Sequence, residues 1–333
     1  MKDSPNLDLL RSLAVACVVI SHLGAHLQWG GPFLNGALGR VGVAIFFVHT
    51  TLVLMLSLER HGAAFVPFMV RRVFRIYPLS MTIVVAMVLL DARWGVAANW
   101  PAIASNLLLV QNITGHTSNP PTLWSLPLEV QMYLVLPALF AIAGSAAALG
   151  RLVTLWMAAV AAVLGLWWLG GDARFIAYVP CFLPGALAYA IGKRATRRLT
   201  PFVLFAAAGG FAISVPLAVD LGLPREPMLW AGCLALGTLI PLTRETTYAP
   251  IAAAAKQVVT YSYGIYLTHL LSIGVAFFAF PGLPGALQWA LFFFCLTSLS
   301  CAAYRWIERP GIAMGKRLAD ASRGASLMRR GGA

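Results

Sequence analysis

Long apolar stretches recur along the chain and are separated by short polar connections. A helix needs about 20 mostly apolar residues to cross a bilayer, and these stretches are close to that length. A helix satisfies its own backbone polar groups within lipid, and the stretches are too apolar and too long for barrel strands. The pattern predicts an all-α integral membrane protein with about ten transmembrane helices. The predicted spans are residues 7–27, 38–58, 74–92, 123–144, 150–169, 174–192, 201–219, 227–243, 258–280 and 284–307.

The composition favours the same fold class. Hydrophobic residues make up 60% of the 333 residues and charged residues only 11%, whereas soluble domains carry about twice that share of charge. The 5 cysteines all lie within predicted spans and have neither disulfide nor metal-ligand spacing. We therefore expect them to pack as small apolar residues, and we expect no metal.

The net charge of +13 could indicate a nucleic-acid partner, but the distribution of the cations argues against one. With the N-terminus in the cytoplasm, all but four of the 24 lysines and arginines fall on the inner side. The four on the outer side are Arg40, Arg93, Arg174 and Arg225. Such a bias follows the positive-inside rule. It predicts cytoplasmic termini and a multi-pass protein of the inner (cytoplasmic) membrane, with the lipid bilayer and no nucleic acid as partner.

The spans leave no room for a soluble catalytic domain. We expect one transmembrane domain at residues 1–310, and a basic cytoplasmic tail at 311–333 that is loosely ordered near anionic headgroups. The longest outer connection, about 93–122, contains an apolar stretch at 100–110 that is too short to span. An interfacial or re-entrant segment is expected there.

Arg11 and His22 lie in the first apolar stretch, eleven residues apart. That spacing is close to three helical turns, so both side chains share one helix face, roughly 16 Å apart along the axis. A cation and an imidazole within a membrane helix are costly and commonly mark a functional path. We expect His22 to act as a base or nucleophile near neutral pH. A purely structural histidine, bonded to a neighbouring helix, is the alternative.

Glu129 is the one carboxylate well inside a predicted span, and Tyr133 follows it by one turn on the same face. Burial disfavours an ionised carboxylate unless it is paired. If Glu129 reaches His22, it would orient the ring and stabilise the imidazolium, as carboxylates do in acyl-transfer sites. The alternative is a glutamate at the outer interface that contacts water or Arg93.

Arg72 and Arg75 are three residues apart near the inner end of the third span, and their forked guanidinium groups suit phosphates. Together with Arg11 they could form a phosphate site at the inner leaflet, with Asp8 holding Arg11 in place. Ordinary positive-inside flanking is the other interpretation of these arginines.

His49 lies in the middle of the second span and is either a second titratable group or a buried polar anchor. His269 and Tyr266 lie in a tyrosine-rich stretch of the ninth span. These tyrosines could line a groove or belong to an interfacial aromatic belt. The sequence does not decide between these readings.

Taken together, these residues resemble the membrane acyltransferase-3 family, bacterial proteins that O-acylate sugars and other exported molecules. The resemblance covers nearly the whole chain, including residues 1–310, and rests on motifs that occur in the family's order. The matching segments are Arg11 with His22, Gly42 to Phe47, Arg72 with Arg75, Ser125-Leu126 with Glu129 and Tyr133, Ser262 to His269, and Glu308-Arg309-Pro310. Two positions depart from the family: Ala44 replaces an acidic residue, and His49-Thr50 replaces a common Ser-Gly.

The resemblance implies an acyl-CoA donor, commonly acetyl-CoA, taken from the cytoplasm. Arg72 and Arg75 would hold the CoA phosphates, and Arg11 would contact the donor near its entrance. His22 and Glu129 would then receive the thioester, with Ser125, Tyr133, His49, Tyr266 and His269 in supporting positions. The acceptor would be a hydroxyl of a cell-envelope or exported glycan, or of a lipid-linked sugar.

The leading hypothesis is therefore an integral membrane O-acyltransferase, most simply an O-acetyltransferase. One alternative is a proton-coupled transporter of an anionic or acylated small molecule, with His22 and Glu129 as its proton relay. A second is acylation of a small-molecule secondary metabolite, and a third is a non-catalytic partner in the assembly of envelope glycans.

Overall fold

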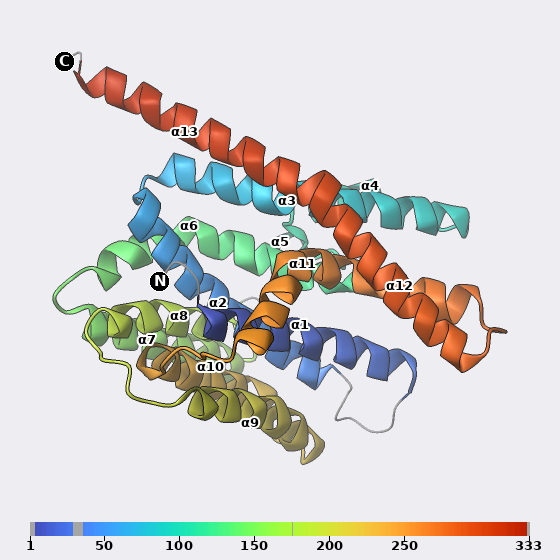
Figure 1. Cartoon of the computed structure of the whole chain (residues 1–333), viewed down its shortest axis with the longest axis horizontal. Helices are drawn as coiled ribbons and strands as arrows, with labels where there is room; N and C mark the ends of the chain where they lie inside the picture. The colour runs from blue at the N-terminus through green and yellow to red at the C-terminus, as the bar shows by residue number, and fades with distance from the viewer. Residues whose placement is uncertain (1–3, 29–35, 175, 332–333) are drawn as a thin grey trace. The chain divides into compact units, whose positions relative to one another are not determined.

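The computed structural model describes residues 4–28, 36–174 and 176–331 of the chain, with side chains described as far as residue 322. Lys2, one of the cations assigned to the inner side, lies outside the described residues. The described chain is built from helices and has no strand (Figure 1). The prediction of an all-helical membrane protein is confirmed, because eight helices are long and apolar enough to cross a bilayer.

Each predicted span coincides with a helical segment, but two of these segments are not among the eight. Helix α8 (Val179–Gly192) has only 14 residues. Helix α10 (Arg225–Leu242) has 18 residues and carries Arg225 and Glu226 in its first turn. The prediction of about ten spans therefore reduces, on length and apolarity, to eight clear candidates and two weaker ones.

The helices form two units. The first unit contains residues 1–62 and 138–262, and the second contains residues 63–137 and 263–333. In the first unit α2 (Ala37–His61) packs against α1 (Pro5–His26), α8, α9 (Pro201–Asp220) and α10. Helix α7 (Ala148–Trp168) and α10 both pack on α8. Within its most apolar stretch α2 is 78% buried and α7 only 11%, so α2 lies in the core of this unit and α7 on its surface.

Small residues bring the helices of the first unit close together. A Cβ atom on Gly42 of α2 would clash with the carbonyl oxygen of Ala14 on α1. A Cβ atom on Gly185 of α8 would lie 2.6 Å from Cβ of Thr51 on α2. Small residues at such crossings let helix backbones approach each other, which is how membrane helices gain packing contacts.

The start of α1 is fixed by local chemistry and by the connection after α10. Ser4 accepts a hydrogen bond from the backbone N–H of Leu7, and Pro5 occupies the first turn, where its missing N–H is no loss. The Ser4 hydroxyl also donates to the carboxylate of Glu245, at 2.9 Å, and Asn6 donates to the carbonyl of Arg244. The first helix is thus tied to the 243–246 segment of its own unit.

The second unit contains α3 (Phe65–Arg93), two short helices α4 (Trp100–Leu107) and α5 (Gln111–Thr114), and the 3₁₀ segment η2 (Pro121–Ser125). It continues with α6 (Leu126–Ala143), α11 (Ala249–Ile273), the π-helical segment η3 (Gly274–Ala279) and α12 (Gly285–Ala303). The chain ends with the π-helical segment η4 (Tyr304–Glu308) and α13 (Arg309–Gly331). The unit boundary falls within α6 and within α11, so each of these helices contributes residues to both units.

Helix α3 is longer than predicted. It begins at Phe65, nine residues before the predicted start at 74, and therefore holds Arg72 and Arg75 in its interior. Arg71 and Arg72 lie just before residue 74 and lower the hydropathy of the segment without interrupting the helix. The short expected segment at 100–110 is helical only as far as Leu107, in α4.

The segment predicted as a basic tail, 311–333, is helical over its described residues, in α13 (Arg309–Gly331), and its role as a cytoplasmic tail near anionic headgroups stays a prediction. Figure 1 shows α12, η4 and α13 following one another as one long helical run, with α3 beside α13. Gly311 and Gly315 lie against Phe74 of α3, where a Cβ atom on Gly315 would be 2.7 Å from Cβ of Phe74. This close packing attaches the beginning of α13 to α3.

Candidate functional site

Arg11 is held by two other residues of the first unit. Its Nε donates a hydrogen bond of 2.8 Å to the hydroxyl of Ser262 on α11, and its Cζ lies 5.5 Å from the ring centroid of Phe46 on α2. A guanidinium group over an aromatic face is attracted by the ring, more strongly where water is excluded. The two contacts position the Arg11 side chain within the first unit. Asp8 lies in the first turn of α1, and its role toward Arg11 stays a prediction.

His22 is half-buried on the same helix, and its tautomer follows from one hydrogen bond. Its Nδ1 lies 2.9 Å from the backbone carbonyl oxygen of Val18. A carbonyl oxygen can only accept, so Nδ1 carries the proton and Nε2 is the basic nitrogen of the neutral ring. The geometry therefore suits His22 as a base through Nε2.

His49 is buried, with 4% of its surface exposed, and its Nδ1 has no hydrogen-bond partner among the described residues. It lies one turn beyond Phe46 on α2, within electrostatic range of Arg11. Ala44, which replaces the acidic residue common in the resembled family, is fully buried, and its carbonyl accepts a contact of 3.6 Å from Sγ of Cys233. The middle of α2 thus places the buried His49 side chain within electrostatic range of Arg11.

The second unit gathers Glu129, Tyr133 and Arg72. The Tyr133 hydroxyl donates a hydrogen bond of 2.5 Å to Oε1 of Glu129, one turn earlier on α6. Phe68 of α3 meets the Tyr133 ring edge-on at 6.3 Å, and Cζ of Arg72 lies 6.0 Å from the Phe68 ring centroid. Arg72 is within electrostatic range of both Glu129 and Tyr133, and its buried Nε has no hydrogen-bond partner among the described residues. The predicted grouping of Glu129 with Tyr133 is present, and Arg72 adds a positive charge to it.

Arg75 has a partner that the sequence reasoning did not anticipate. Its Nη1 lies 3.4 Å from Oε2 of Glu308, a carboxylate that is fully buried on the π-helical segment η4. The last predicted span ended at residue 307, one residue before Glu308, so Glu129 was counted as the one carboxylate well inside a span. Its place in the Glu308-Arg309-Pro310 segment, which matches the resembled family, was the signal that could have revealed it. A buried carboxylate needs a paired cation, so Arg75 has a structural partner that Arg72 lacks.

Ser125 and Tyr266 contact each other in the second unit. Their hydroxyl oxygens are 2.7 Å apart, and the Tyr266 hydroxyl lies 2.6 Å from the carbonyl oxygen of Thr122. The imidazole of His269 is fully buried 6.2 Å from the Tyr266 ring, and its Nδ1 lies 3.1 Å from the carbonyl oxygen of Ile265. These bonds lock the start of α6 to α11, so Ser125, Tyr266 and His269 form a scaffold beside Glu129.

Tyr263 is a second residue that the sequence reasoning did not single out. Its hydroxyl donates a 2.8 Å hydrogen bond to the carbonyl oxygen of Ile76, and it is buried within electrostatic range of Glu129 and Glu308. The position of Tyr263 near Tyr266, in the tyrosine-rich stretch, was the sequence signal that could have identified it.

The candidate residues therefore form two groups, one in each unit. The first unit holds Asp8, Arg11, His22 and His49, and the second holds Arg72, Arg75, Ser125, Glu129, Tyr133, Tyr266 and His269. Glu129 and His22 belong to different units, so the predicted contact between them stays a prediction. Among the described residues, no group of three or more His, Cys, Asp or Glu side chains could hold a metal ion.

The comparisons with known proteins address the family. The family model described as an acyltransferase domain, that of acyltransferase-3, matches residues 4–305. The chain is also similar to a protein named peptidoglycan O-acetyltransferase OatA from Listeria monocytogenes, with 25% identity over 93% of this chain. The match covers 56% of that relative, so the chain spans little more than half of its length. No solved structure matches the chain.

Proposed function

Because the chain belongs to the acyltransferase-3 family, we propose that it is an integral membrane O-acyltransferase that moves an acyl group from cytoplasmic acyl-CoA to a glycan hydroxyl. The observation that carries the proposal is the hydrogen bond between Nδ1 of His22 and the Val18 carbonyl. It makes Nε2 a base on a helix that is long enough to span the bilayer. A base of this kind suits the removal of a proton from a hydroxyl group.

In the proposed reaction the acceptor hydroxyl oxygen attacks the thioester carbonyl carbon of the donor. The new bond is the ester C–O bond, and the C–S bond to CoA breaks. His22 Nε2 takes the hydroxyl proton and passes it to the departing thiolate, so charge and protons balance. If Nε2 instead attacks the thioester first, an acyl-histidine precedes the same product, and both routes need the tautomer that the Val18 bond selects.

Donor binding is assigned to cationic residues of both groups. Arg11 has its Nε bonded to Ser262, and Arg72 has a buried Nε without a partner among the described residues. Forked guanidinium groups bind phosphate oxygens through paired hydrogen bonds. We assign Arg72 the larger part, since Arg75 is already paired with Glu308. Acetyl-CoA is the proposed donor, and Glu129, oriented by Tyr133, is proposed to act beside the reacting thioester.

The proposed acceptor is supported by the membrane setting and by the relative. A multi-pass protein with the proposed cytoplasmic donor can deliver an acyl group to a hydroxyl on the far side of the inner membrane. The relative is named for peptidoglycan, so we propose a cell-envelope glycan, or its lipid-linked precursor, as the acceptor class.

The test is acyl transfer by the purified protein in detergent, with radiolabelled acetyl-CoA and a crude envelope glycan fraction. His22→Ala should lower the rate about a hundred- to ten-thousand-fold, the usual contribution of a general base. Its matched control is His26→Ala, a change one turn further along α1 at an exposed histidine. Arg72→Ala should raise the donor KM, and Arg93→Ala, at the exposed end of α3, should not.

A folded His22→Ala variant with a normal transfer rate would overturn the proposed role of His22. Label retained on wild-type protein in the absence of acceptor would select the acyl-histidine route. If no donor is bound or consumed while sealed vesicles take up an acylated or anionic solute, the protein is a transporter instead.

A further inference from the structure

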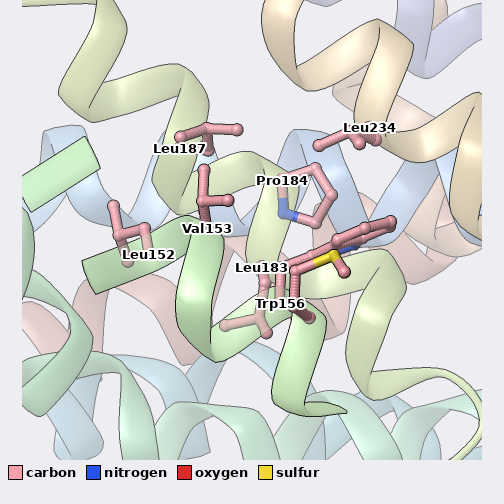
Figure 2. A pocket seen from close by; sticks show the side chains of 8 residues that line it. Leu152, Val153, Trp156, Leu183, Pro184, Leu187 and Leu234 are labelled. Carbon is pink, nitrogen blue, oxygen red and sulfur yellow. The ribbon is translucent and has the colours of Figure 1, made fainter. Parts of the chain in front are cut away.

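The first unit has an apolar groove on its outer surface that the proposed reaction does not use. Figure 2 shows its lining, with side chains from α7, α8 and α10. The hollow has a volume of about 170 Å³. The lining residues are Leu152, Val153, Trp156, Met157, Leu183, Pro184, Leu187 and Leu234. All are apolar, and the only indole N–H among them, on Trp156, donates to the carbonyl oxygen of Pro180 at 3.0 Å. The groove therefore offers no hydrogen-bonding group to an occupant.

The groove faces outward from the unit. Its floor is formed by α8, where Leu183 and Leu187 are each only 6% exposed, and α7 forms one wall. On that wall Val153 is 44% exposed and Met157 56% exposed. Helix α7 is the least buried of the eight candidate spans, so this wall faces lipid in a bilayer. An apolar hollow that is open to lipid fills with hydrocarbon, because an empty one forfeits dispersion contacts.

Cations lie at one end of the groove. Arg151 directly precedes Leu152 on α7 and is exposed. Arg194, two residues beyond the end of α8, donates from Nη2 to the carbonyl oxygens of Ser145 and Ala146, at 3.2 and 3.1 Å. Those bonds hold the Arg194 guanidinium at the connection that leads into α7, so both cations stand where α7 begins.

The beginning of α7 adds a second attraction for an anion. Its N-cap residue, Ala147, has no side chain that could cap the helix, and no side-chain hydrogen bond satisfies the first-turn N–H groups. Backbone N–H groups and the helix dipole favour negative charge at such a position. The groove thus runs from an anion-favouring end into a wholly apolar hollow.

We propose that this groove is a binding site for one acyl chain of an anionic phospholipid, whose phosphate meets Arg151, Arg194 and the start of α7. The hollow is slightly larger than a 150 Å³ apolar cavity that accommodates benzene, so it takes a segment of roughly six chain carbons. On binding, the acyl chain of the lipid gains packing contacts. It gains no hydrophobic transfer free energy, because it moves from one hydrocarbon environment into another. Selectivity for the lipid therefore comes from its headgroup.

The test is retention of lipid by the full-length purified protein, measured by native mass spectrometry after incubation with phosphatidylglycerol or phosphatidylcholine of the same chain length. We expect one phosphatidylglycerol to be retained in preference to phosphatidylcholine. Each arginine near an anionic headgroup contributes about fivefold in affinity, so Arg151→Gln with Arg194→Gln should weaken retention by roughly 30-fold. The matched charge control is Arg198→Gln, an exposed cation outside the groove.

A second variant tests the groove itself. Val153→Trp should fill the hollow and displace the chain, whereas Leu155→Trp, an exposed position on α7 outside the lining, should leave retention unchanged. Equal retention of the two lipids by wild-type protein would overturn the proposal. So would unchanged retention of phosphatidylglycerol in the folded Val153→Trp variant. Because lipid is read directly, the result does not depend on acyl transfer.

Discussion

At the residue scale, single hydrogen bonds decide what the candidate side chains can do. The Val18 carbonyl selects the tautomer of His22, and the Tyr133 hydroxyl orients the carboxylate of Glu129. Neither partner is remote in sequence, because each lies four residues away on the same helix. Local geometry of this kind follows from helical spacing alone, and it is the part of the site that the sequence specifies most directly.

Tyr133→Phe should lower acyl transfer while leaving the fold intact. The change removes the hydroxyl that orients Glu129 and retains the ring that packs against Phe68. A hydrogen bond to a charged group contributes about 1.5–3 kcal/mol, so the rate should fall about ten- to a hundredfold. Steady-state transfer by the purified protein measures it, with the exposed Tyr248→Phe as control. A folded Tyr133→Phe protein with the wild-type rate would show that this hydroxyl does not serve the reaction.

Glu308→Gln should destabilise the protein because it leaves the Arg75 charge in a partly buried position without its carboxylate. Breaking a buried ion pair from one side costs about 3–5 kcal/mol, whereas replacing both partners with apolar residues is often neutral. Thermal unfolding in detergent should show a clear drop in Tm for Glu308→Gln and a recovery for Glu308→Leu combined with Arg75→Met. Asp172→Asn, at an exposed ion pair with Arg174, should have little effect. An unchanged Tm for Glu308→Gln would mean that the pair does not stabilise the fold.

The Arg75–Glu308 pair also marks the limit of the sequence argument at this scale. Helical spacing relates residues that are one turn apart. It carries no information about partners such as Arg75 and Glu308, which are 233 positions apart in the sequence. The hydropathy window that located the last span ended at the charge itself. Long-range pairs between polar residues in apolar segments therefore had to come from the structure.

At the element scale, hydropathy located helices well and their ends poorly. Each predicted span corresponds to a helical segment, since apolar length determines what can cross a bilayer. The start of α3 and the helical state of α13 were missed. Both involve cationic residues, which lower hydropathy but are good helix formers when a neighbouring helix packs against them.

Gly185→Ala should lower stability because the position is a helix crossing. Its added Cβ atom would clash with the carbonyl oxygen of Val48 and lie 2.6 Å from Cβ of Thr51. Overpacking of this kind costs about 1–3 kcal/mol. Gly165→Ala on α7 is the matched control, because a Cβ atom there meets nothing within 4 Å, and alanine is the better helix former. Thermal unfolding of both variants in detergent measures the effect, and equal Tm values would refute the close crossing of α2 and α8.

At the scale of the whole molecule, the fold class was predictable and the assembly of the site was not. Hydrophobic residues make up 60% of the chain and are gathered in recurring stretches. This pattern is enough to predict a helical membrane protein. The candidate residues, by contrast, divide between the two units, with Arg11 and His22 in one and Arg72 and Glu129 in the other. No periodicity within one helix relates residues of different units, so the sequence could propose their roles but not their distance.

The orientation predicted from the cations is testable on intact cells. In a background without the five native cysteines, Asp172→Cys should react with a membrane-impermeant maleimide, because the connection between α7 and α8 is predicted to be outside. Arg198→Cys, on the connection between α8 and α9, should react only after the membrane is opened. If Arg198→Cys is labelled in intact cells, the predicted orientation is reversed. If neither cysteine is labelled until the membrane is opened, the connections before and after α8 do not lie on opposite sides of the membrane.

The π-helical segment η4 holds one residue more than an ordinary helical turn would at this point. A π-turn holds one residue more than an α-turn, and such turns occur frequently at functional sites. Deleting a single residue within η4 would let the segment relax to an ordinary α-turn and would leave the residues after it facing nearly the same way relative to α12. The same deletion within α12 would rotate everything after it by about 100°, so Glu308 would leave Arg75, and Gly311 and Gly315 would leave Phe74. In evolutionary terms, the loss of one residue is tolerated more readily at η4 than within α12.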